Sequence, residues 1–342
     1  MLFKALNIPK MRRCELSFAQ FKIGTLNLLV LQTLLLLLMV MGARGESFPS
    51  KPVNLIVPFT SGGSNDTFAR ILALELKNSW NQSVVVDNKP GAGGSVGATF
   101  VARATPDGHT LMLMSSAFAI NAAMQPGVAP DPIQDFKSIA LVGKGPMILA
   151  ASKASGIANV QDLIVKAKTN PGALQYATAG MGSVTHLAME LLANLAGIHL
   201  TAIPYKGGTQ AITDLMGGHL QLYMGSVPQV MAQAHSGKIT VLGSSGLKVS
   251  PATPTVMPIA QTIPNYEIEL WWGIFAPSAV SSELAQKLNA DINLALSSPK
   301  VGEYLLAEGV DVKPLSNQKF SQFIKAELKK WQDVVSKAHL NG

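Results

Sequence analysis

A glycine-rich turn between an expected strand and an expected helix carries the polar groups best suited to chemistry in this sequence. The turn, residues 61–64, reads Ser-Gly-Gly-Ser and follows the apolar run Val53–Phe59, which is typical of a short buried strand. Asn65 and Asp66 can cap the helix that begins next. Because the first N–H groups of a helix lack partners and carry partial positive charge, the turn predicts an anion site.

Three further segments repeat this arrangement, each after a strand-like run and before a helical pattern. They are residues 90–95 (Pro-Gly-Ala-Gly-Gly-Ser), 179–183 (Ala-Gly-Met-Gly-Ser) and 206–209 (Lys-Gly-Gly-Thr). A single turn of this kind is more often only a tight connection. Four of them indicate a cradle for a polar ligand, in which Lys206 is either a solvated loop residue or the cation that meets a carboxylate.

Other chemistries find weaker support in the sequence. The glycines in 91–97 superficially resemble a dinucleotide fingerprint, but their spacing is not G-x-G-x-x-G. Gly-Ser-Ser-Gly at 243–246 has the wrong spacing for the G-x-S-x-G nucleophile elbow of a hydrolase. His186 and Glu190 lie one helical turn apart and could form half of a metal site, but no second histidine or carboxylate is placed to complete it. We therefore expect no cofactor, no metal and no catalytic residue.

Strand-like and helix-like segments alternate through the body of the chain, which predicts an α/β fold with largely parallel sheets. Within it, 121–135 is expected to be an irregular, proline-bearing crossing, and 139–142 and 147–151 two separate strands. A long strand is expected at Glu267–Ala276, and three helices follow it. Because this C-terminal part has helices and almost no strands, we expect it to pack on a domain whose sheet is formed by earlier parts of the chain.

The first 45 residues have the pattern of an export signal. Lys and Arg residues precede an uncharged stretch at 23–43, and residues 43–45 supply small side chains at the two positions that a signal peptidase reads. We expect cleavage near Gly45, with an uncleaved membrane anchor as the alternative. Either Met1 or Met11 can be the start. Cys14, the only cysteine, precedes the apolar stretch, so the mature chain would have neither disulfides nor thiol chemistry.

The basic character of the chain also comes mostly from this leader. The formal net charge is +7, but six of the 27 Lys and Arg residues and one of the 20 Asp and Glu residues precede residue 46, which leaves +2. No basic run is interleaved with aromatic residues, so we expect no nucleic-acid partner. The remaining chain is long enough for two domains of ordinary size.

Eight motifs in one order cover essentially the whole expected mature chain. They are V-P-F-x-x-G-G-x-x-D-x-x-A-R (57–70), D-N-K-P-G-A-G-G-S-V-G (87–97), A-x-P-D-G-H-T-L (104–111), Asn121 with D-P and D-F (131–136), G-M-G-S-V-T-H-L (180–187), P-Y-K-G-G (204–208), D-L-M-G-G (214–218) and W-W-G-I-F-A-P (271–277). Together they resemble the substrate-binding proteins of tripartite tricarboxylate transporters, the Bug-type periplasmic solute-binding proteins. Any one motif is weak, whereas eight in register are highly specific.

This resemblance implies an α/β fold of two lobes, the type II periplasmic binding protein or Venus flytrap, with two crossing strands. Residues 1–45 would be the signal peptide, 46–142 plus 274–342 the first lobe and 143–273 the second. The crossings are expected near Ile139–Gly143 and Trp272–Phe275. The implied partners of this monomer are a small carboxylate ligand and the membrane permease subunits of a tripartite tricarboxylate transporter, and the implied compartment is the periplasm.

The resemblance also implies which residues bind the ligand. Family members hold carboxylates at helix starts in the cleft, largely by backbone N–H groups, hydroxyls and ordered water. Carried over by motif, three loops form this site, with a lysine loop beside them. The expected ligand-binding residues are Thr60, Ser61, Gly62, Gly63, Asn65, Asp66, Ser115, Ser116, Gly182, Ser183, Thr185, His186, Lys206 and Gly207.

Two departures from the family pattern concern the identity of the ligand. The run 218–221 reads Gly-His-Leu-Gln where the family usually has a second acidic residue, and Thr60-Ser61 stands where proline is common. The predicted function is therefore a carboxylate-binding component that closes on its solute and hands it to a permease. The alternatives are a periplasmic hydrolase or lyase acting on a small acid, and a ligand-sensing partner of a membrane kinase. The absence of a thiol and of a metal set from the expected mature chain argues against an enzyme.

Overall fold

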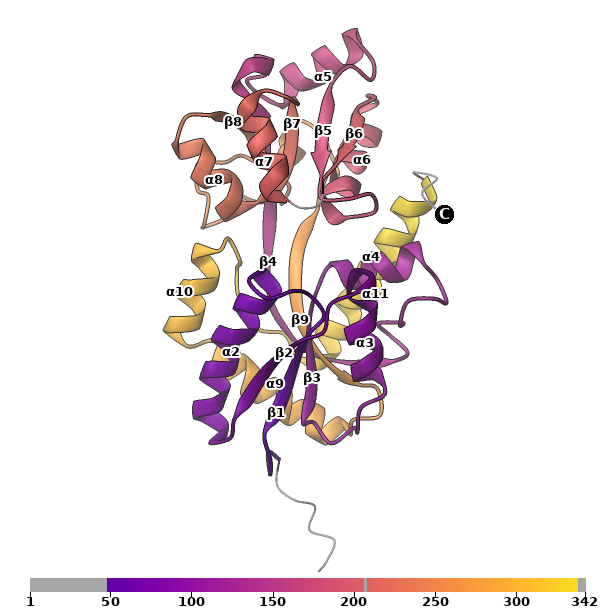
Figure 1. The fold of residues 1–342 in the computed structure, drawn as a ribbon, viewed down its shortest axis with the longest axis vertical. Coiled ribbons are helices and arrows are strands. Elements are labelled where there is room, and N and C mark those ends of the chain that lie inside the picture. The colour runs from indigo at the N-terminus through magenta and orange to yellow at the C-terminus, as the bar shows by residue number, and fades with distance from the viewer. Residues whose placement is uncertain (1–47, 206–207, 338–342) are drawn as a thin grey trace, which may run out of the picture. The chain divides into compact units, whose positions relative to one another are not determined.

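The computed structural model describes residues 48–205 and 208–337, which form two α/β lobes joined by two long strands (Figure 1). The expected signal peptide, Lys206, Gly207 and residues 338–342 lie outside this described part. No helix within the described ranges is both long and apolar enough to cross a membrane.

The first lobe is built around a mixed sheet in the order β2-β1-β3-β9-β4. β1 (Val53–Val57) lies parallel between β2 (Val84–Asn88) and β3 (Thr110–Ser115), and β9 (Glu269–Pro277) is antiparallel to β3. The alternation of buried apolar residues on β1 and the apolar face of the following helix produce its core. Its helices are α2 (Ser64–Trp80), α3 (Ser95–Ala102), α4 (Ala117–Met124), α9 (Ser282–Leu296), α10 (Pro299–Ala307) and α11 (Asn317–Lys337).

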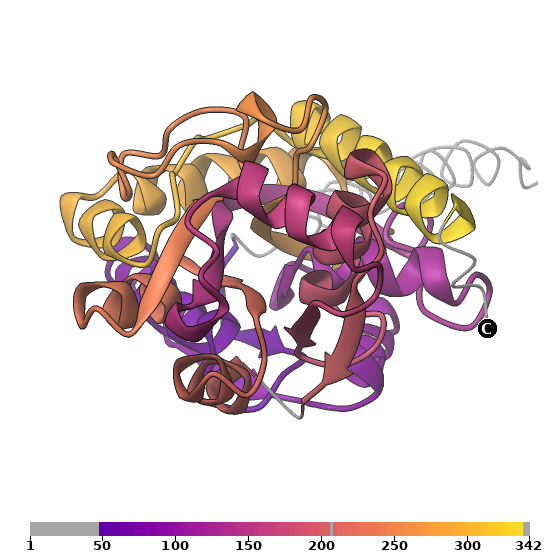
Figure 2. The same ribbon diagram turned by 90° about the horizontal axis from the view of Figure 1, so that it is seen from above.

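The second lobe has its own sheet, which contains the far part of β4. β7 (Leu222–Ser226) and β8 (Ile239–Ser244) pair antiparallel with β4, and β5 (Gln175–Thr178) lies parallel between β7 and β6 (Thr201–Pro204). Its helices are α5 (Val160–Thr169), α6 (Val184–Ala196), α7 (Gly208–Gly217) and α8 (Val227–His235). In the view from above, this lobe covers the first, and α11 runs along one edge (Figure 2).

β4 (Phe136–Ser152) is unbroken, which corrects the prediction of two separate strands at 139–142 and 147–151. The intervening Gly-Lys-Gly-Pro looks like a turn in the sequence, because glycine and proline punctuate strands. In the structure Lys144 pairs with β9 on one side and with Asp311 on the other, and both glycines lie under the segment 309–311. A Cβ on Gly145 would collide with the carbonyl oxygen of Gly309, so glycine here permits a third segment to pack on the strand.

The passage between the two sheets occurs at Lys144–Pro146 and Glu269–Leu270. There β4 stops pairing with β9 and begins pairing with β7 and β8. The segment expected to be the return crossing, Trp272–Phe275, pairs with β3 inside the first sheet, and Ile139–Gly143 lies opposite that stretch of β9. The expected lobe boundaries remain a prediction.

Residues 121–135 are not entirely irregular, which corrects a second expectation. α4 occupies Ala117–Met124 because its first turn buries Phe118 edge-on against Phe136 and Phe275. The sequence pattern of this helix is apolar on nearly every side, so it lacks the periodicity that identifies an amphipathic helix.

Two close approaches join the lobes beside the crossing strands. A Cβ on Gly182, just before α6, would lie 2.7 Å from Met124 Sδ at the end of α4, and a Cβ on Gly309 would lie 2.5 Å from Val227 Cβ at the start of α8. Both glycines have positive φ angles, 75° and 80°. A side chain at either position would push the lobes apart.

Candidate ligand-binding site

A cavity of about 560 Å³ lies where the two lobes face each other. Its wall collects the first residues of α2, α6 and α7 and the N-cap of α8. These four helices present their N-terminal ends, where N–H groups are unpaired and the partial charge is positive. The lining residues are Gly62, Gly63, Ser64, Thr67, Met147, Val184, Thr185, Gly208, Thr209, Tyr223, Ser226, Gln229, Leu270, Tyr304 and Glu308.

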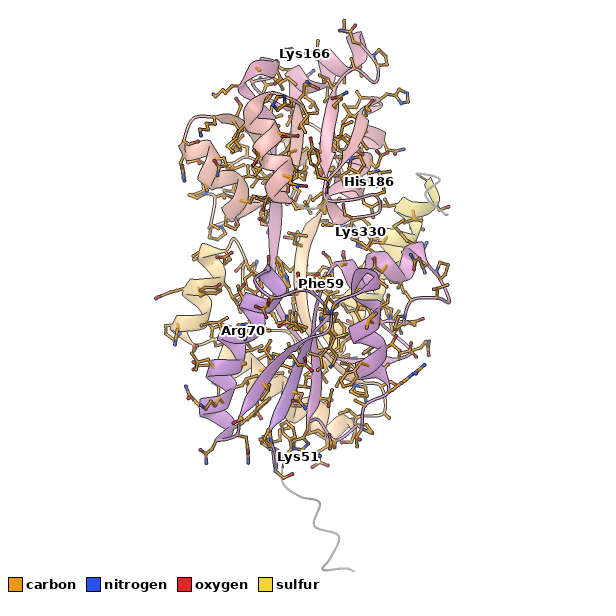
Figure 3. All side chains as sticks on the ribbon, viewed as in Figure 1. Lys51, Phe59, Arg70, Lys166, His186 and Lys330 are labelled. Atoms are coloured by element: carbon orange, nitrogen blue, oxygen red, sulfur yellow. The ribbon has the colours of Figure 1, made fainter. Side chains whose placement is uncertain are left out.

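The loop before α2 is held by a buried carboxylate. Asp66 Oδ2 accepts the Gly62 N–H at 3.0 Å and the Arg70 Nε–H at 2.9 Å, and Asn88 Nδ2 donates to Asp66 Oδ1 at 3.0 Å. Arg70 Nη2 lies 2.9 Å from the same carboxylate, and its guanidinium is half exposed on the side of α2 (Figure 3). Hydrogen bonds from Arg70 above all, with those from Gly62 and Asn88, lower the pKa of Asp66 to about 2 despite its burial.

This arrangement gives Asp66 and Gly62 a different task from the one predicted. The Asp66 carboxylate faces its own loop, and the Gly62 N–H is already used. Within the described part of the chain, the N–H groups of Gly63, Ser64 and Asn65 have no acceptor. These three are the donors that the first lobe can offer.

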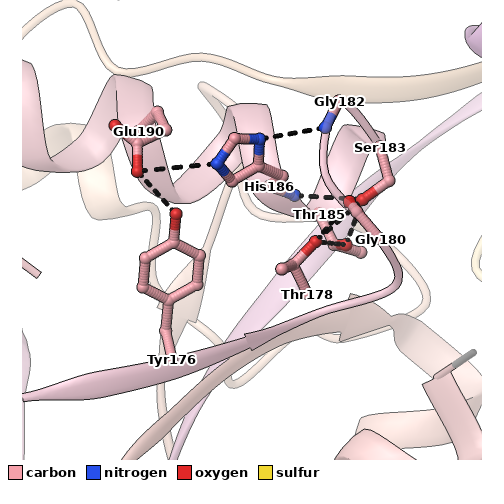
Figure 4. Close-up of polar contacts among 8 residues, drawn as sticks. All are labelled: Tyr176, Thr178, Gly180, Gly182, Ser183, Thr185, His186 and Glu190. Atoms are coloured by element: carbon pink, nitrogen blue, oxygen red, sulfur yellow. Dashed lines mark hydrogen bonds and ion pairs between the residues drawn. The ribbon is translucent and has the colours of Figure 1, made fainter. Parts of the chain in front are cut away.

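The facing loop before α6 repeats this construction with a histidine. The Gly182 N–H donates to His186 Nδ1 at 3.1 Å, and Ser183 caps the helix by accepting the His186 N–H at 3.3 Å (Figure 4). Thr185 Oγ1 accepts the Ala179 N–H at 2.8 Å and lies 2.8 Å from Ser183 Oγ. The hydroxyls therefore fix the shape of the loop, and only Thr185 also reaches the cavity wall.

His186 is buried and neutral in this setting. Because Nδ1 accepts a hydrogen bond, Nε2 carries the proton and points toward Glu190 Oε1, 3.8 Å away. Tyr176 donates to the same Glu190 oxygen at 2.5 Å, and its ring stacks on the imidazole. Burial lowers the pKa of His186, while Glu190 acts in the opposite direction.

The wall beside α7 and α8 is polar but uncharged. Tyr223 donates its hydroxyl to Gln229 Oε1 at 3.0 Å, and burial raises the pKa of Tyr223 to about 12. A Cβ on Gly208 would lie 2.5 Å from that hydroxyl oxygen, so glycine permits α7 to begin against it. Beyond these uncharged groups, the carboxylate of Glu308, directly after α10, also lines the cavity.

Similarity to known proteins agrees with this architecture. Residues 68–340 match the family described as tripartite tricarboxylate transporter family receptor, TctC. A protein encoded in the tcbD-tcbE intergenic region of Pseudomonas sp. strain P51 is 33% identical over 87% of this chain and 89% of its own length. BugT of Bordetella pertussis is 32% identical over 85% and 90%. The chain belongs to the tripartite tricarboxylate transporter receptor family.

Solved structures of similar proteins share the two-lobed fold. An R. palustris protein with adipate has a TM-score of 0.76 at 30% identity and covers 85% of this chain and 98% of its own. The periplasmic binding protein BugD has 0.74 at 31%, covering 86% and 99%. MatC from Rhodopseudomonas palustris with bound malate has 0.72 at 29%, covering 84% and 100%. The predicted family and the predicted two-lobed α/β fold are confirmed, and the family is one of substrate-binding receptors rather than enzymes.

The expected ligand residues of this receptor separate into groups. Gly62, Gly63 and Thr185 line the cavity. Asp66, Gly182, Ser183 and His186 shape the two loops instead. Lys206 and Gly207 lie outside the described residues, and the remaining expected residues are not in the wall: Thr60, Ser61, Asn65, Ser115 and Ser116. Of the four glycine turns, residues 90–95 also lie outside the wall, and there the Gly93 carbonyl accepts a hydrogen bond from Asn121 in α4.

Most of the lining residues are not among the expected ligand-binding residues, and four of these have large polar side chains: Tyr223, Gln229, Tyr304 and Glu308. None lies in the glycine turns. Tyr304 and Glu308 come from α10, far along the chain, where the pattern indicates only an amphipathic helix. Their spacing of four residues, which places both on one helix face, is the sole signal that the sequence contains.

The geometry suits anion binding better than catalysis. Both ring nitrogens of His186 face groups other than the Ser183 and Thr185 hydroxyls, so the ring is not placed to activate either as a nucleophile. Among the residues that the structure describes, no group of three or more His, Cys, Asp or Glu side chains is arranged to hold a metal ion. A larger hollow of about 650 Å³ between α9 and α11 is lined by Asn289 and Asn317, whose amides are spent on backbone carbonyls.

Proposed function

We propose that this receptor is a periplasmic solute-binding protein that captures a small carboxylate between its lobes. The observation that carries the proposal is the convergence of four helix N-termini on one cavity. Backbone N–H groups at Gly63 and Ser64, the Thr185 hydroxyl and ordered water would hold the carboxylate. The protein would then deliver the ligand to the membrane permease of a tripartite tricarboxylate transporter.

Backbone donors contribute a large part of the binding free energy in this proposal. Each charge-assisted hydrogen bond to a carboxylate is worth roughly 1.5 to 3 kcal/mol, and the sum over the donors offsets the cost of association. The helix ends add to this because their partial charges act across a partly enclosed cavity. Two structurally similar proteins, with adipate and with bound malate, support a ligand of this class.

Lobe closure would accompany binding. The lobes, with boundaries near residues 143 and 273, would rotate about the two crossing strands. A ligand that contacts both lobes favours the closed form and shifts the population toward it. Small-angle scattering should show compaction on ligand addition, and an unchanged profile at saturation would contradict closure.

Native mass spectrometry of the protein purified from cells tests the function directly. We expect a co-purified small acid in the spectrum and, after its removal, calorimetric binding of adipate, malate or a related acid. N-terminal sequencing of the same sample should show a chain that begins near residue 46 and lacks the leader. A protein that binds no carboxylate from a broad panel would refute the proposal.

A further inference from the structure

Glu308 is the one charged side chain in the described cavity wall, and it has no ion-pair partner among the described residues. Its side chain is partly buried, whereas Glu303 on the same helix is exposed and lies outside the wall. A carboxylate in the wall of a carboxylate-binding cavity would repel a second negative group on the ligand.

The backbone around Glu308 is rigid. Gly309 donates to the Leu306 carbonyl at 2.9 Å and Val310 to the Leu305 carbonyl at 2.8 Å, which is the Schellman pattern with glycine at positive φ. Gly309 also packs on Val227 at the start of α8. Glu308 is therefore held beside the second lobe, as the positions of α10 and α8 on one side of the crossing strands show (Figure 1).

The helix that carries Glu308 has the opposite polarity from the other four at the cavity. α10 presents its C-terminal end, where unpaired carbonyl groups carry partial negative charge and favour a cation. Tyr304 lies one turn before Glu308 on the same face and also lines the cavity. An aromatic ring beside a carboxylate is a suitable environment for an ammonium group.

The cavity wall thus carries helix ends of both signs. The positive N-terminal ends of α2, α6, α7 and α8 line it together with the negative end of α10 and Glu308, which lies beside the start of α8. Arg70, on the helix that begins at the cavity, pairs with Asp66, and Lys144, where the crossing strands pass between the sheets, pairs with Glu269. In the described wall, a second carboxylate on the ligand would meet no cationic side chain.

We propose that the ligand is a small aminocarboxylate, with its carboxylate at the helix starts and its protonated amine between Glu308 and Tyr304. This inference rests on the proposed function and specifies the substrate class. Glu308 is then the residue that separates aminocarboxylates from dicarboxylates of equal length.

Three matched pairs of acids test the proposal: 4-aminobutyrate with succinate, 5-aminopentanoate with glutarate, and 6-aminohexanoate with adipate. Calorimetric titration of the wild-type protein should show tighter binding of the amine-bearing member in the best-fitting pair. Glu308→Gln should weaken that member by about tenfold or more, because a hydrogen bond to a charged group is lost, and should strengthen the dicarboxylate. Glu303→Gln is the control and should leave both affinities unchanged.

The outcomes distinguish this inference from the function beneath it. If dicarboxylates bind at least as tightly as their partners and Glu308→Gln leaves the ratio unchanged, the aminocarboxylate assignment is wrong, while the carboxylate-binding function stands. If no member of any pair binds and no acid co-purifies, both fail. If the Glu308→Gln protein has the same thermal unfolding midpoint as the wild-type protein, any change in its affinity is local to the cavity.

Discussion

The loops that open α2 and α6 share one construction with opposite chemistry. In each, a glycine N–H donates to a side chain four residues later, and that side chain faces a charged residue four residues later again. The series is Gly62, Asp66, Arg70 in the first lobe and Gly182, His186, Glu190 in the second. The i, i+4, i+8 spacing lies along one helix face, so a shared backbone geometry explains both.

The difference lies in what happens when protons are added. Asp66 keeps its charge and its role as acceptor down to a pH of about 2, because Arg70 and Asn88 stabilise the carboxylate. His186 accepts the Gly182 N–H only while its ring is neutral, since a protonated imidazole has no lone pair to offer. The loop before α2 therefore keeps its internal hydrogen bond at low pH, whereas the loop before α6 loses its bond once His186 is protonated.

The largest expected effect is at the first loop. Gly63→Val should abolish ligand binding, because the space beyond the Gly63 Cα is open and a side chain there would fill the place of the carboxylate. The variant should fold, since an added Cβ meets no atom within 4 Å and the residue has no positive φ. Gly302→Val, in α10 and equally open, is the matched control for calorimetry.

Lys206→Ala completes that test. If the backbone donors dominate, this variant should weaken binding far less than Gly63→Val. The opposite result would be a Lys206→Ala protein that no longer binds the ligand and a Gly63→Val protein that binds it normally. That result would show that a point charge, rather than the backbone, holds the ligand.

The second largest effect is on the free energy of unfolding, and it concerns Asp66 in the first loop. Asp66→Asn should lower the free energy of unfolding by roughly 2 kcal/mol near neutral pH, since the shift of its pKa from 3.8 to about 2 measures how strongly the fold favours the carboxylate. This stabilisation is present above the unfolded pKa and is lost as the pH falls from 3.8 through about 2. Urea unfolding at several pH values measures it. Equal stability of the two proteins at pH 7 would contradict the role given to Asp66.

The third effect concerns pH and the second loop. Burial lowers the pKa of His186, so from about pH 6.5 downward the unfolded chain binds a proton more readily than the folded one, and stability falls. Ligand affinity should fall as the ring itself protonates and the Gly182 bond is lost. Glu190 and Tyr176 are the ionisable groups that face the ring, and only Glu190 favours protonation. His186→Gln keeps an acceptor without titrating, so its affinity should be flatter between pH 7 and 5.

The smallest expected effect comes from a hydroxyl in the second loop. Thr185→Val removes the acceptor of the Ala179 N–H and should cost about 1 kcal/mol, a several-fold loss of affinity. Ser183→Ala removes a helix cap and should act mainly on stability by a similar amount. Calorimetry together with thermal unfolding separates the two. If Ser183→Ala weakens binding more than Thr185→Val, the ligand contacts Ser183 directly.

Local sequence signals predicted most of the elements that carry the loops. The helices Val184–Ala196 and Ser282–Leu296 each begin directly after a serine, which is a helix-start signal in a sequence, and Ser183 and Ser281 cap them by accepting nearby backbone N–H groups. The same logic failed at Gly143–Pro146, where glycine serves a distant contact with 309–311 instead of a turn. A composition rule cannot separate these uses, because the partner is more than 160 residues away along the chain.

The site was predictable only to the level of its loops. The glycine turn before α2 identified Gly62 and Gly63, and the family resemblance added Thr185; all three line the cavity. That Asp66 and His186 turn back into their own loops depends on Asn88 from β2 and Tyr176 from β5, together with Glu190 one turn further along α6. Glu308 reaches the cavity through the packing of α10 on α2 and α8, and no local pattern encodes that.

The segment 309–311 also bears on the order in which the molecule can be completed during synthesis. It pairs with Lys144, covers Gly145 and touches Val227, so it meets both lobes at the point where they join. The second lobe's strands β5 to β8 and helices α5 to α8 all precede residue 245, whereas the first lobe awaits β9 and three C-terminal helices. A chain that folds from its N-terminal end can therefore assemble most of the second lobe while the first is unfinished, and the contact of 309–311 with both lobes forms only when the last tenth of the chain is in place.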